Sequence, residues 1–240
     1  MTLARHGAIV IGAGVAGLST ALYLQRAGIA VAVIDPLPPG SGASFGNAGL
    51  LSPDTAVPIA LPGMLRKVPG WLSDPLGPLS VRPSYFPRAL PWLLRWIDSG
   101  RMQRVMAISD AMRALHRDAL DCWKELLGPE LYRTLIRQSG QVQVWEGDAE
   151  SASAEVERQV RERHGIRADP LTADDLRQLF PGISREVTRG LLVPGNGYTV
   201  NPQRSVRALG ELFCQEGGTL VNERAMKLIP TSPTARPSRS

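Results

Sequence analysis

The first forty residues alternate between short apolar runs and a helical spacing of apolar side chains. The run Gly7–Ile11 is apolar and partly β-branched, which predicts a buried strand. From Val15 to Leu22 the apolar residues recur three and four apart, as in a helix, and this pattern stops near Gly28. A second apolar run, Ala30–Ile34, predicts another strand, and Asp35 follows it directly. The order strand, helix, strand predicts a βαβ unit.

A complete G-x-G-x-x-G lies between the first strand and the helix. Gly12 allows the tight turn out of the strand, Gly14 lets the backbone approach a pyrophosphate, and Gly17 lets helix and strand pack closely. The helix N-terminus offers N–H groups and a positive dipole end to phosphates, and Asp35 can accept hydrogen bonds from a ribose. A signal-peptide core would lack this glycine spacing and an internal Arg26. The stretch therefore predicts a dinucleotide site formed by Ile11, Gly12, Ala13, Gly14, Val15, Ala16, Gly17 and Asp35.

Beyond residue 100, helical and strand patterns alternate. The first predicted elements are an amphipathic helix Ser109–Leu127 ended by Gly128-Pro129, a strand Gln141–Trp145 and a helix Ala152–His164. A helix capped by Thr172 with Asp175 follows, and then a hairpin of Gly190–Pro194 and Tyr198–Val200 with its turn at Asn196-Gly197. The last predicted elements are a helix Gln203–Gln215 and a strand beginning at Thr219–Val221.

A short helix in the proline-rich, aromatic stretch 57–100 has an apolar face formed by Trp92, Leu93, Trp96 and Ile97. Two interpretations fit this face. It packs in the core of a cap over a cofactor, which is the favoured interpretation, or it lies on a membrane with its arginines near the head groups.

Composition excludes several classes of function. The net charge of +5 is carried by arginines scattered among acidic residues, without a basic block, so we expect no nucleic-acid partner. The chain has no apolar run of membrane-spanning length, no secretory signal, and no metal-ligand cluster. Cys122 and Cys214 are interpreted as buried small hydrophobes, and no role is assigned to the three histidines. We expect a cytoplasmic protein, with peripheral association at the inner face of the membrane as an alternative.

The loop after Asp35 carries a resemblance. Residues 36–53 are rich in glycine, proline and serine, and small residues let a backbone lie against a flat ligand. Together, G-A-G-V-A-G and S-F-G-N-A-G-L-L-S-P resemble the FAD-dependent D-amino-acid oxidase and dehydrogenase family, and its bacterial D-amino-acid dehydrogenase branch above all. The resemblance implies FAD as cofactor, with Ser44, Asn47, Ala48 and Leu51 beside it. Pro36-Leu37 departs from the family, which often carries a basic residue there.

The resemblance also implies a fold and its division along the chain. The expected class is α/β, a Rossmann-like FAD/NAD(P)-binding domain with an inserted α+β substrate or cap domain. The expected parts are the first FAD-binding segment 1–56, the cap 57–200 and the return to the FAD domain 201–229. The composition of residues 230–240, rich in proline, serine and arginine, predicts a disordered tail. The family continues further and later supplies an arginine for the substrate carboxylate, so the chain is expected to be truncated.

Three functions remain open from the sequence. The first is oxidative deamination of a D-amino acid or related secondary amine, by hydride transfer from the substrate Cα to the flavin, with the electron acceptor and the catalytic residues unknown. The second is an inactive dinucleotide-binding fragment of such an enzyme. The third is an NAD-linked oxidoreductase, although the long small-residue loop favours FAD.

Overall fold

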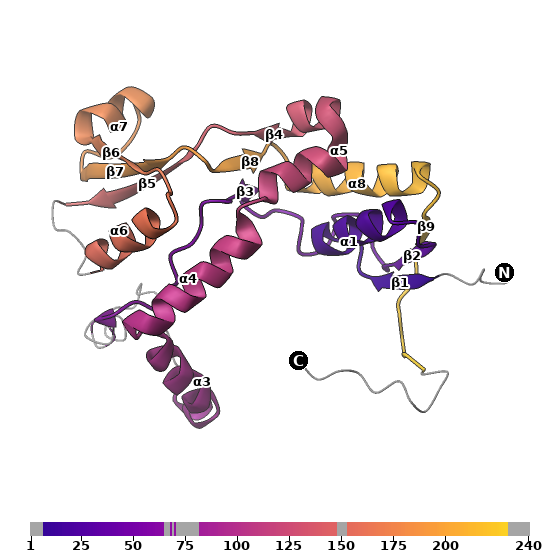
Figure 1. Ribbon diagram of the computed structural model, residues 1–240, viewed down its shortest axis with the longest axis horizontal. Helices are drawn as coiled ribbons and strands as arrows, with labels where there is room; N and C mark the ends of the chain where they lie inside the picture. The colour runs from indigo at the N-terminus through magenta and orange to yellow at the C-terminus, as the bar shows by residue number, and fades with distance from the viewer. Residues whose placement is uncertain (1–6, 65–67, 69, 71–81, 148–152, 230–240) are drawn as a thin grey trace. The chain divides into compact units, whose positions relative to one another are not determined.

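The computed structural model describes residues 7–64, 68, 70, 82–147 and 153–229, and it divides into two compact units. Unit 1 comprises Met1–Gly49, Cys122–Arg137 and Thr199–Ser240, and unit 2 comprises Leu50–Asp121 and Gln138–Tyr198. Figure 1 shows the elements of each unit along the chain. The predicted disordered tail 230–240 and His6 lie outside the described residues. The four-part division expected from the sequence stays a prediction.

Unit 1 is built on a parallel sheet in the order β1-β2-β9. Its strands are Ala8–Ile11, Val31–Ile34 and Thr219–Val221, so the α/β fold class is confirmed and the predicted strands are present. Pairing in register places Ala8 opposite Val31. Because the strands are parallel, their carboxyl ends lie at one edge of the sheet, where the ligand of an open α/β sheet binds.

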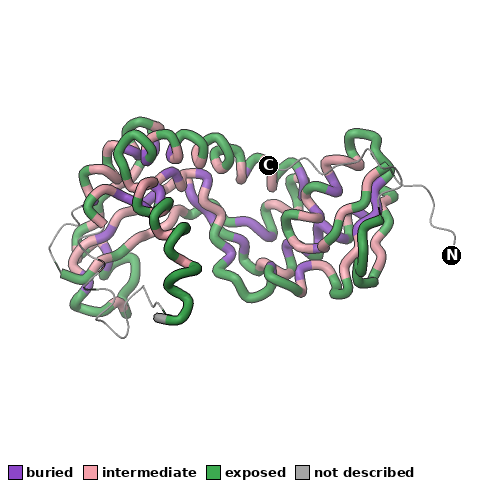
Figure 2. Tube along the Cα trace, turned by 90° about the horizontal axis from the view of Figure 1, so that it is seen from below, coloured by how far each residue is buried: buried purple, intermediate pink, exposed green. Residues whose placement is uncertain are grey.

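Helices α1, Val15–Arg26, and α8, Pro202–Gln215, run side by side in unit 1 (Figure 1). The sequence predicted both. The side chain of Asn201 caps α8 by accepting the Arg204 N–H at 2.9 Å, which satisfies one free donor of the first turn. The buried residues of this unit, among those purple in Figure 2, include Leu18, Leu22, Val33, Leu209 and Phe213.

Strand β1 is less buried than its composition predicts. The sequence indicated a buried strand, but Ile9 is 61% exposed and Ile11 54% exposed. Side chains alternate between the faces of a strand, so the two isoleucines share one face. Among the described residues that face is left open.

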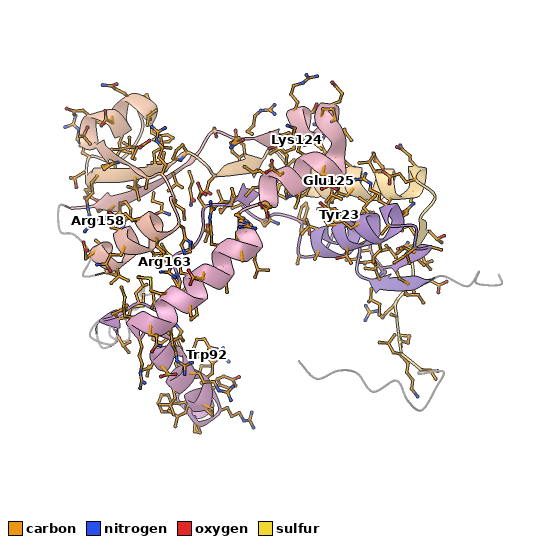
Figure 3. All side chains as sticks on the ribbon, in the orientation of Figure 1. Tyr23, Trp92, Lys124, Glu125, Arg158 and Arg163 are labelled. Atoms are coloured by element: carbon orange, nitrogen blue, oxygen red, sulfur yellow. The ribbon has the colours of Figure 1, made fainter. Side chains whose placement is uncertain are left out.

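Arginine and glutamate residues connect the helices of unit 1. Arg26 forms an ion pair of 2.7 Å with Glu216, just after α8, and donates to the backbone carbonyls of Glu125 and Leu126. Tyr23 donates to Glu125 at 3.1 Å, and the two side chains meet in Figure 3. Burial, with hydrogen bonds to Cys122 and Glu125, raises the pKa of Tyr23. These contacts hold α1 against α5, which spans Ala119–Leu135 and leads into β4, Ile136–Arg137.

Unit 2 contains an antiparallel sheet in the order β5-β7-β6. The strands are Gln141–Glu146, Val187–Val193 and Asp169–Thr172, and the unit also holds α6, Ala154–Arg163, and α7, Ala173–Leu179. The predicted capping box of α7 is confirmed. The Thr172 hydroxyl accepts the Asp175 N–H at 3.2 Å, and the Asp175 carboxylate accepts the Thr172 N–H at 2.8 Å.

The expected single helix Ser109–Leu127 is wrong. Helix α4 spans Met102–His116, a turn at residues 117–118 interrupts the helix, and α5 follows. The predicted break at Gly128 is present, with φ at +72°, a value that glycine adopts without strain. Leu115, an apolar residue inside the predicted amphipathic helix, is 81% exposed. The helical period continues across the break, so periodicity alone did not reveal it.

The expected hairpin at Asn196-Gly197 is also wrong. Strand β7 pairs with β5 and β6, whereas β8, Gly197–Thr199, pairs with β3, Leu50–Leu51. Asn196 is 2% exposed because its side chain makes long-range hydrogen bonds rather than facing solvent in a tight turn.

The favoured interpretation of the helix that carries Trp92 and Trp96, that its apolar face packs in a core, does not hold among the described residues. After a 3-10 turn, Pro83–Tyr85, helix α3 spans Phe86–Ser99 and has no buried residue. Trp92, labelled in Figure 3, is 62% exposed and stacks on Trp96 with ring centroids 6.5 Å apart. The prediction of buried cysteines fails as well, since Cys122 is half-buried and Cys214 exposed.

The Arg26–Glu216 pair predicts a dependence of stability on pH. The hydrogen bond from Arg26 holds the pKa of Glu216 below its ordinary 4.5, so the pair stabilises the fold above the unfolded pKa and loses this effect as the pH falls through the folded pKa. We expect Glu216→Gln to lower the free energy of urea unfolding by about 1 kcal/mol at neutral pH, because the pair is partly exposed.

The loss should shrink as the pH falls below 4.5. Glu130→Gln is the control, because Glu130 and its partner Arg133 are both largely exposed. An equal loss of stability at neutral and acidic pH would contradict the assignment.

Candidate functional site

The G-x-G-x-x-G forms a tight turn between β1 and α1. Gly12 has φ at +108°, and its N–H donates to the Ile34 carbonyl at 2.9 Å, which continues the sheet pairing into the turn. A Cβ on Gly17 would overlap the Gly12 carbonyl oxygen. Only glycine fits at this approach of helix to turn, as the motif predicted.

The N-terminus of α1 points its first amides into the same turn. Gly14 caps the helix with an extended backbone, and no side chain of its own closes the end. The Val15 N–H donates to the Ser44 hydroxyl at 3.1 Å. Ser44 is 7% exposed, so the loop after β2 packs its hydroxyl against the helix end. The structure thus brings the glycine motif and the predicted loop together at one place.

Asp35 holds the turn through both carboxylate oxygens. Its Oδ2 accepts the Ala13 N–H at 2.7 Å, and its Oδ1 accepts the Leu37 N–H at 2.7 Å. Each carboxylate oxygen has a further lone pair for a hydroxyl donor. Sequence reasoning expected a ribose acceptor here, and the structure adds a local role that holds the second strand to the glycine turn.

The loop Ser44–Gly49 is shaped by Asn47. Its side-chain oxygen accepts the Gly49 N–H at 2.8 Å, and its amide donates to the Ser44 carbonyl at 3.5 Å. Asn47 and Ala48 are exposed, and the predicted Leu51 belongs to unit 2, where it pairs with Gly197. Ile11, Val15 and Ala16 are exposed around the turn of unit 1.

Asn222 is a residue that sequence reasoning missed. It follows β9, so it lies at the same carboxyl edge of the sheet as the glycine turn and Asp35. With its amide nitrogen turned toward the loop, its side chain donates to the carbonyls of Asp35 and Pro36 at 3.1 and 3.0 Å. A polar residue directly after a predicted third strand was the available signal.

Two histidines of unit 2, to which the sequence assigned no role, lie within hydrogen-bond distance of neighbouring residues. His164 Nε2 lies 2.6 Å from the Ser109 hydroxyl, and His116 Nδ1 lies 2.9 Å from the Thr55 carbonyl. Ser109 is fully buried, which excludes it as an open nucleophile. Within residues 7–64, 68, 70, 82–147 and 153–229, no group of acidic, histidine or cysteine side chains has the arrangement of a metal site.

Unit 2 also contains a cavity of about 480 Å³ between α6 and the antiparallel sheet. Its wall combines apolar residues, such as Ile166 and Leu191, with the ion-paired Arg161 and Glu157. Arg189 lies over the Trp145 ring, 5.3 Å from its centroid. These charged groups already hold one another, and none of the predicted cofactor residues lines the cavity.

The family model DAO, FAD dependent oxidoreductase, matches residues 8–235, which is most of the chain. The chain belongs to this FAD-dependent oxidoreductase family. The family resemblance seen in the glycine motif and the Ser44–Pro53 loop is confirmed. The family is FAD dependent, which agrees with the expected cofactor.

Relatives within the family carry related names. The chain is 37% identical over 227 residues to a D-amino-acid oxidase of Bradyrhizobium diazoefficiens, covering 93% of this chain and 53% of that protein. It is 29% identical to a D-amino acid dehydrogenase of Vibrio vulnificus, covering 93% and 54%. The chain therefore spans about half the length of the curated relatives it matches.

Solved structures share the fold at low identity. An L-amino acid deaminase from Proteus vulgaris aligns with a TM-score of 0.57 and 14% identity over 90% of this chain and 39% of the other. A glycine oxidase from Geobacillus kaustophilus aligns with a TM-score of 0.54 and 18% identity, over 90% and 46%. Both agree with the fold class predicted from the sequence.

The close approach at Gly17 predicts a loss of stability on substitution. Gly17→Ala forces a methyl group against the Gly12 carbonyl, so we expect a drop of about 1–3 kcal/mol in the free energy of unfolding, measured in urea. Gly42→Ala is the matched control, because a Cβ there meets no atom within 4 Å. Equal stability of the two variants would show that the turn yields without strain.

Proposed function

We propose that the chain holds the FAD of an amino-acid oxidoreductase at the carboxyl edge of the β1-β2-β9 sheet. The observation that carries this proposal is the glycine turn, where the Gly12–Gly17 backbone places the N-terminus of α1 at this edge and the side chain that lies against its first amide is the short Ser44 hydroxyl. Backbone amides and the helix dipole favour the pyrophosphate there. Asp35 accepts from the adenosine ribose, while Ser44, Asn47, Ala48 and Leu51 border the flavin side.

The residues present fit a bound dinucleotide. A Cβ on Gly14 would meet one atom within 4 Å, the Ser44 hydroxyl at 3.4 Å, so the space beside the helix end is open to a phosphate. The same hydroxyl already accepts one helix amide and can donate its proton to a phosphate oxygen. Asp35 stands one residue after β2, at the distance along the fingerprint where a ribose is held.

The proposed reaction is oxidation of an amino acid at its Cα–N bond, with a D-amino acid as the favoured substrate. Support comes from the names of the relatives, which are D-amino-acid oxidases and dehydrogenases. The flavin, when bound, accepts the hydride from the substrate Cα. The chain's own contribution is to fix the dinucleotide through the turn, Asp35 and the Ser44 loop.

Assay of the purified chain separates the alternatives. Turnover of D-alanine or D-proline with an artificial electron acceptor, and not of the L-enantiomers, supports the amino-acid oxidoreductase. FAD binding without turnover supports the inactive binding module. Binding of NAD in place of FAD, followed by nicotinamide fluorescence, would overturn the FAD assignment.

Gly14→Val tests the phosphate position. A Cβ at position 14 meets only the Ser44 hydroxyl, at 3.4 Å, and the valine methyl groups beyond it would occupy the place of the pyrophosphate, so we expect a loss of FAD affinity that exceeds any change in the urea midpoint. Two charge-assisted hydrogen bonds of about 1.5–3 kcal/mol each correspond to a hundredfold loss or more. Gly182→Val is the control, at another glycine with open space. A Gly14→Val protein that binds FAD as tightly as wild type would place the phosphates elsewhere.

A membrane surface is the second partner that we propose, and α3 is the observation that favours it. No helix in the described part of the chain is long and apolar enough to cross a membrane. Helix α3 instead exposes Trp92, Leu94 and Ile97, with Arg88 and Arg95 on the same short helix. An amphipathic helix with aromatic residues and arginines binds the interface of anionic lipids.

Sedimentation with vesicles tests this second partner. We expect the chain to bind phosphatidylglycerol vesicles and Trp92→Glu to lower the bound fraction about fivefold, because a charge enters the apolar face. Leu115→Glu is the control, since Leu115 on α4 is even more exposed, at 81% against 62% for Trp92, and lies outside α3. Equal binding of the two variants would exclude α3 as the contact.

A further inference from the structure

The peptide group between Pro36 and Leu37 is bonded on both of its sides within unit 1. Its N–H, on Leu37, donates to Asp35 Oδ1 at 2.7 Å. Its carbonyl, on Pro36, accepts the side-chain amide of Asn222 at 3.0 Å. Because a peptide group is planar, a hydrogen bond that fixes the carbonyl also fixes the direction of the N–H. The group thus connects Asn222 with the carboxylate proposed to bind the ribose.

The orientation of the Asn222 amide follows from the groups that it faces. These are the backbone carbonyls of Asp35 and Pro36, at 3.1 and 3.0 Å. A carbonyl can only accept a hydrogen bond, and the amide nitrogen of asparagine carries two donors. The nitrogen therefore faces the two carbonyls and donates to both.

Strand pairing brings Asn222 to this place. Strand β9 lies parallel to β2, with Val221 opposite Ile34. The Asp35 N–H donates to the Val221 carbonyl at 3.1 Å, so the pairing continues one residue beyond β2. Asn222 comes next along the chain, and its side chain reaches the turn that follows Asp35.

The Asp35 carboxylate is held through both oxygens, by two different parts of unit 1. The N–H of Ala13, in the glycine turn, donates to Oδ2, and the N–H of Leu37 donates to Oδ1. Only a carboxylate held at both oxygens directs its remaining lone pairs toward one place. Pro36 and Leu37 are exposed, so packing contributes little to holding their peptide group. The hydrogen bond from Asn222 supplies that hold.

We infer that Asn222 is a positioning residue for Asp35, acting through the Pro36–Leu37 peptide group. This inference rests on the proposed function, in which Asp35 accepts hydrogen bonds from the adenosine ribose. A hydrogen bond to the Pro36 carbonyl also polarises the peptide group and strengthens the bond that its N–H makes. Without the Asn222 amide, the Leu37 N–H turns more freely, and the carboxylate is held firmly by the Ala13 N–H alone.

The test compares ADP with dideoxy-ADP, which lacks both ribose hydroxyls, as ligands of the full chain. We expect wild type to bind ADP more tightly than dideoxy-ADP. Asn222→Ala should weaken the binding of ADP and of FAD about fivefold, the effect of one ordinary hydrogen bond, and leave the binding of dideoxy-ADP unchanged. Thr219→Ala is the control, at an exposed polar residue at the other end of β9, and it should match wild type with every ligand.

A double variant shows whether Asn222 acts through Asp35. In an Asp35→Ala background, Asn222→Ala should cause no further loss of ADP affinity, because the group that it positions is gone. A full further loss in that background would overturn the inference. An equal loss of ADP and dideoxy-ADP in the single variant would overturn it too, since a merely structural role affects both ligands alike.

Further measurements keep the outcomes separate. Far-UV circular dichroism shows whether Asn222→Ala folds, and if it does not, Asn222→Leu, similar in size and without a donor, replaces it. If wild type binds neither FAD nor ADP, or if Gly14→Val binds FAD as tightly as wild type, the proposed function fails and the inference fails with it. Equal binding of ADP and dideoxy-ADP by wild type would overturn the role of Asp35. If wild type distinguishes the two nucleotides and Asn222→Ala does so equally well, only the positioning role fails.

Discussion

The contact between Gly17 and the carbonyl of Gly12 is the constraint on which unit 1 depends. Because no Cβ separates them, α1 starts close to the end of β1, and its first amides open at the carboxyl edge of the sheet. The other polar groups of the candidate site lie at this same edge. Asp35 and Ser44 place a carboxylate and a hydroxyl on amides of the turn. A bulkier residue at position 17 would move the helix end away from all of them.

The candidate site was predicted from the sequence to the extent that it is local. The glycine spacing, the acidic residue after β2 and the small-residue loop are each visible within forty residues, and their chemistry is tied to those positions. The family and its FAD dependence followed from them and are confirmed. The assignment of individual residues to parts of the cofactor stays a prediction. Asn222 was not predicted because it lies 187 residues beyond Asp35 along the chain, and only the pairing of β9 with β2 brings the two together.

Elements were predicted well where one signal decided them. The capping box of Thr172 and Asp175 and the break at Gly128 depend on neighbours in sequence. The wrong predictions of the single helix and of the hairpin share a cause. Hydrophobic period and turn composition do not show which segments pack or pair with one another. The helical period ran through the break after His116, and Asn196-Gly197 had the composition of a hairpin turn. The prediction for the tryptophan face of α3 fails for another reason, because amphipathicity shows that a helix face is apolar but not what covers it.

Asn196 shows why the long-range contacts inside unit 2 are hard to derive from the sequence. In the sequence, asparagine before glycine favours a turn exposed to water. In the structure its side chain is buried between Asp54 and Gln141, which lie 142 and 55 residues away along the chain. A buried amide with both its oxygen and its nitrogen bonded fixes two segments at once, because a partner lost on either side leaves a polar group unsatisfied. Such a residue has no periodic or compositional signal, and its role follows only from where the strands β3 and β8 pair.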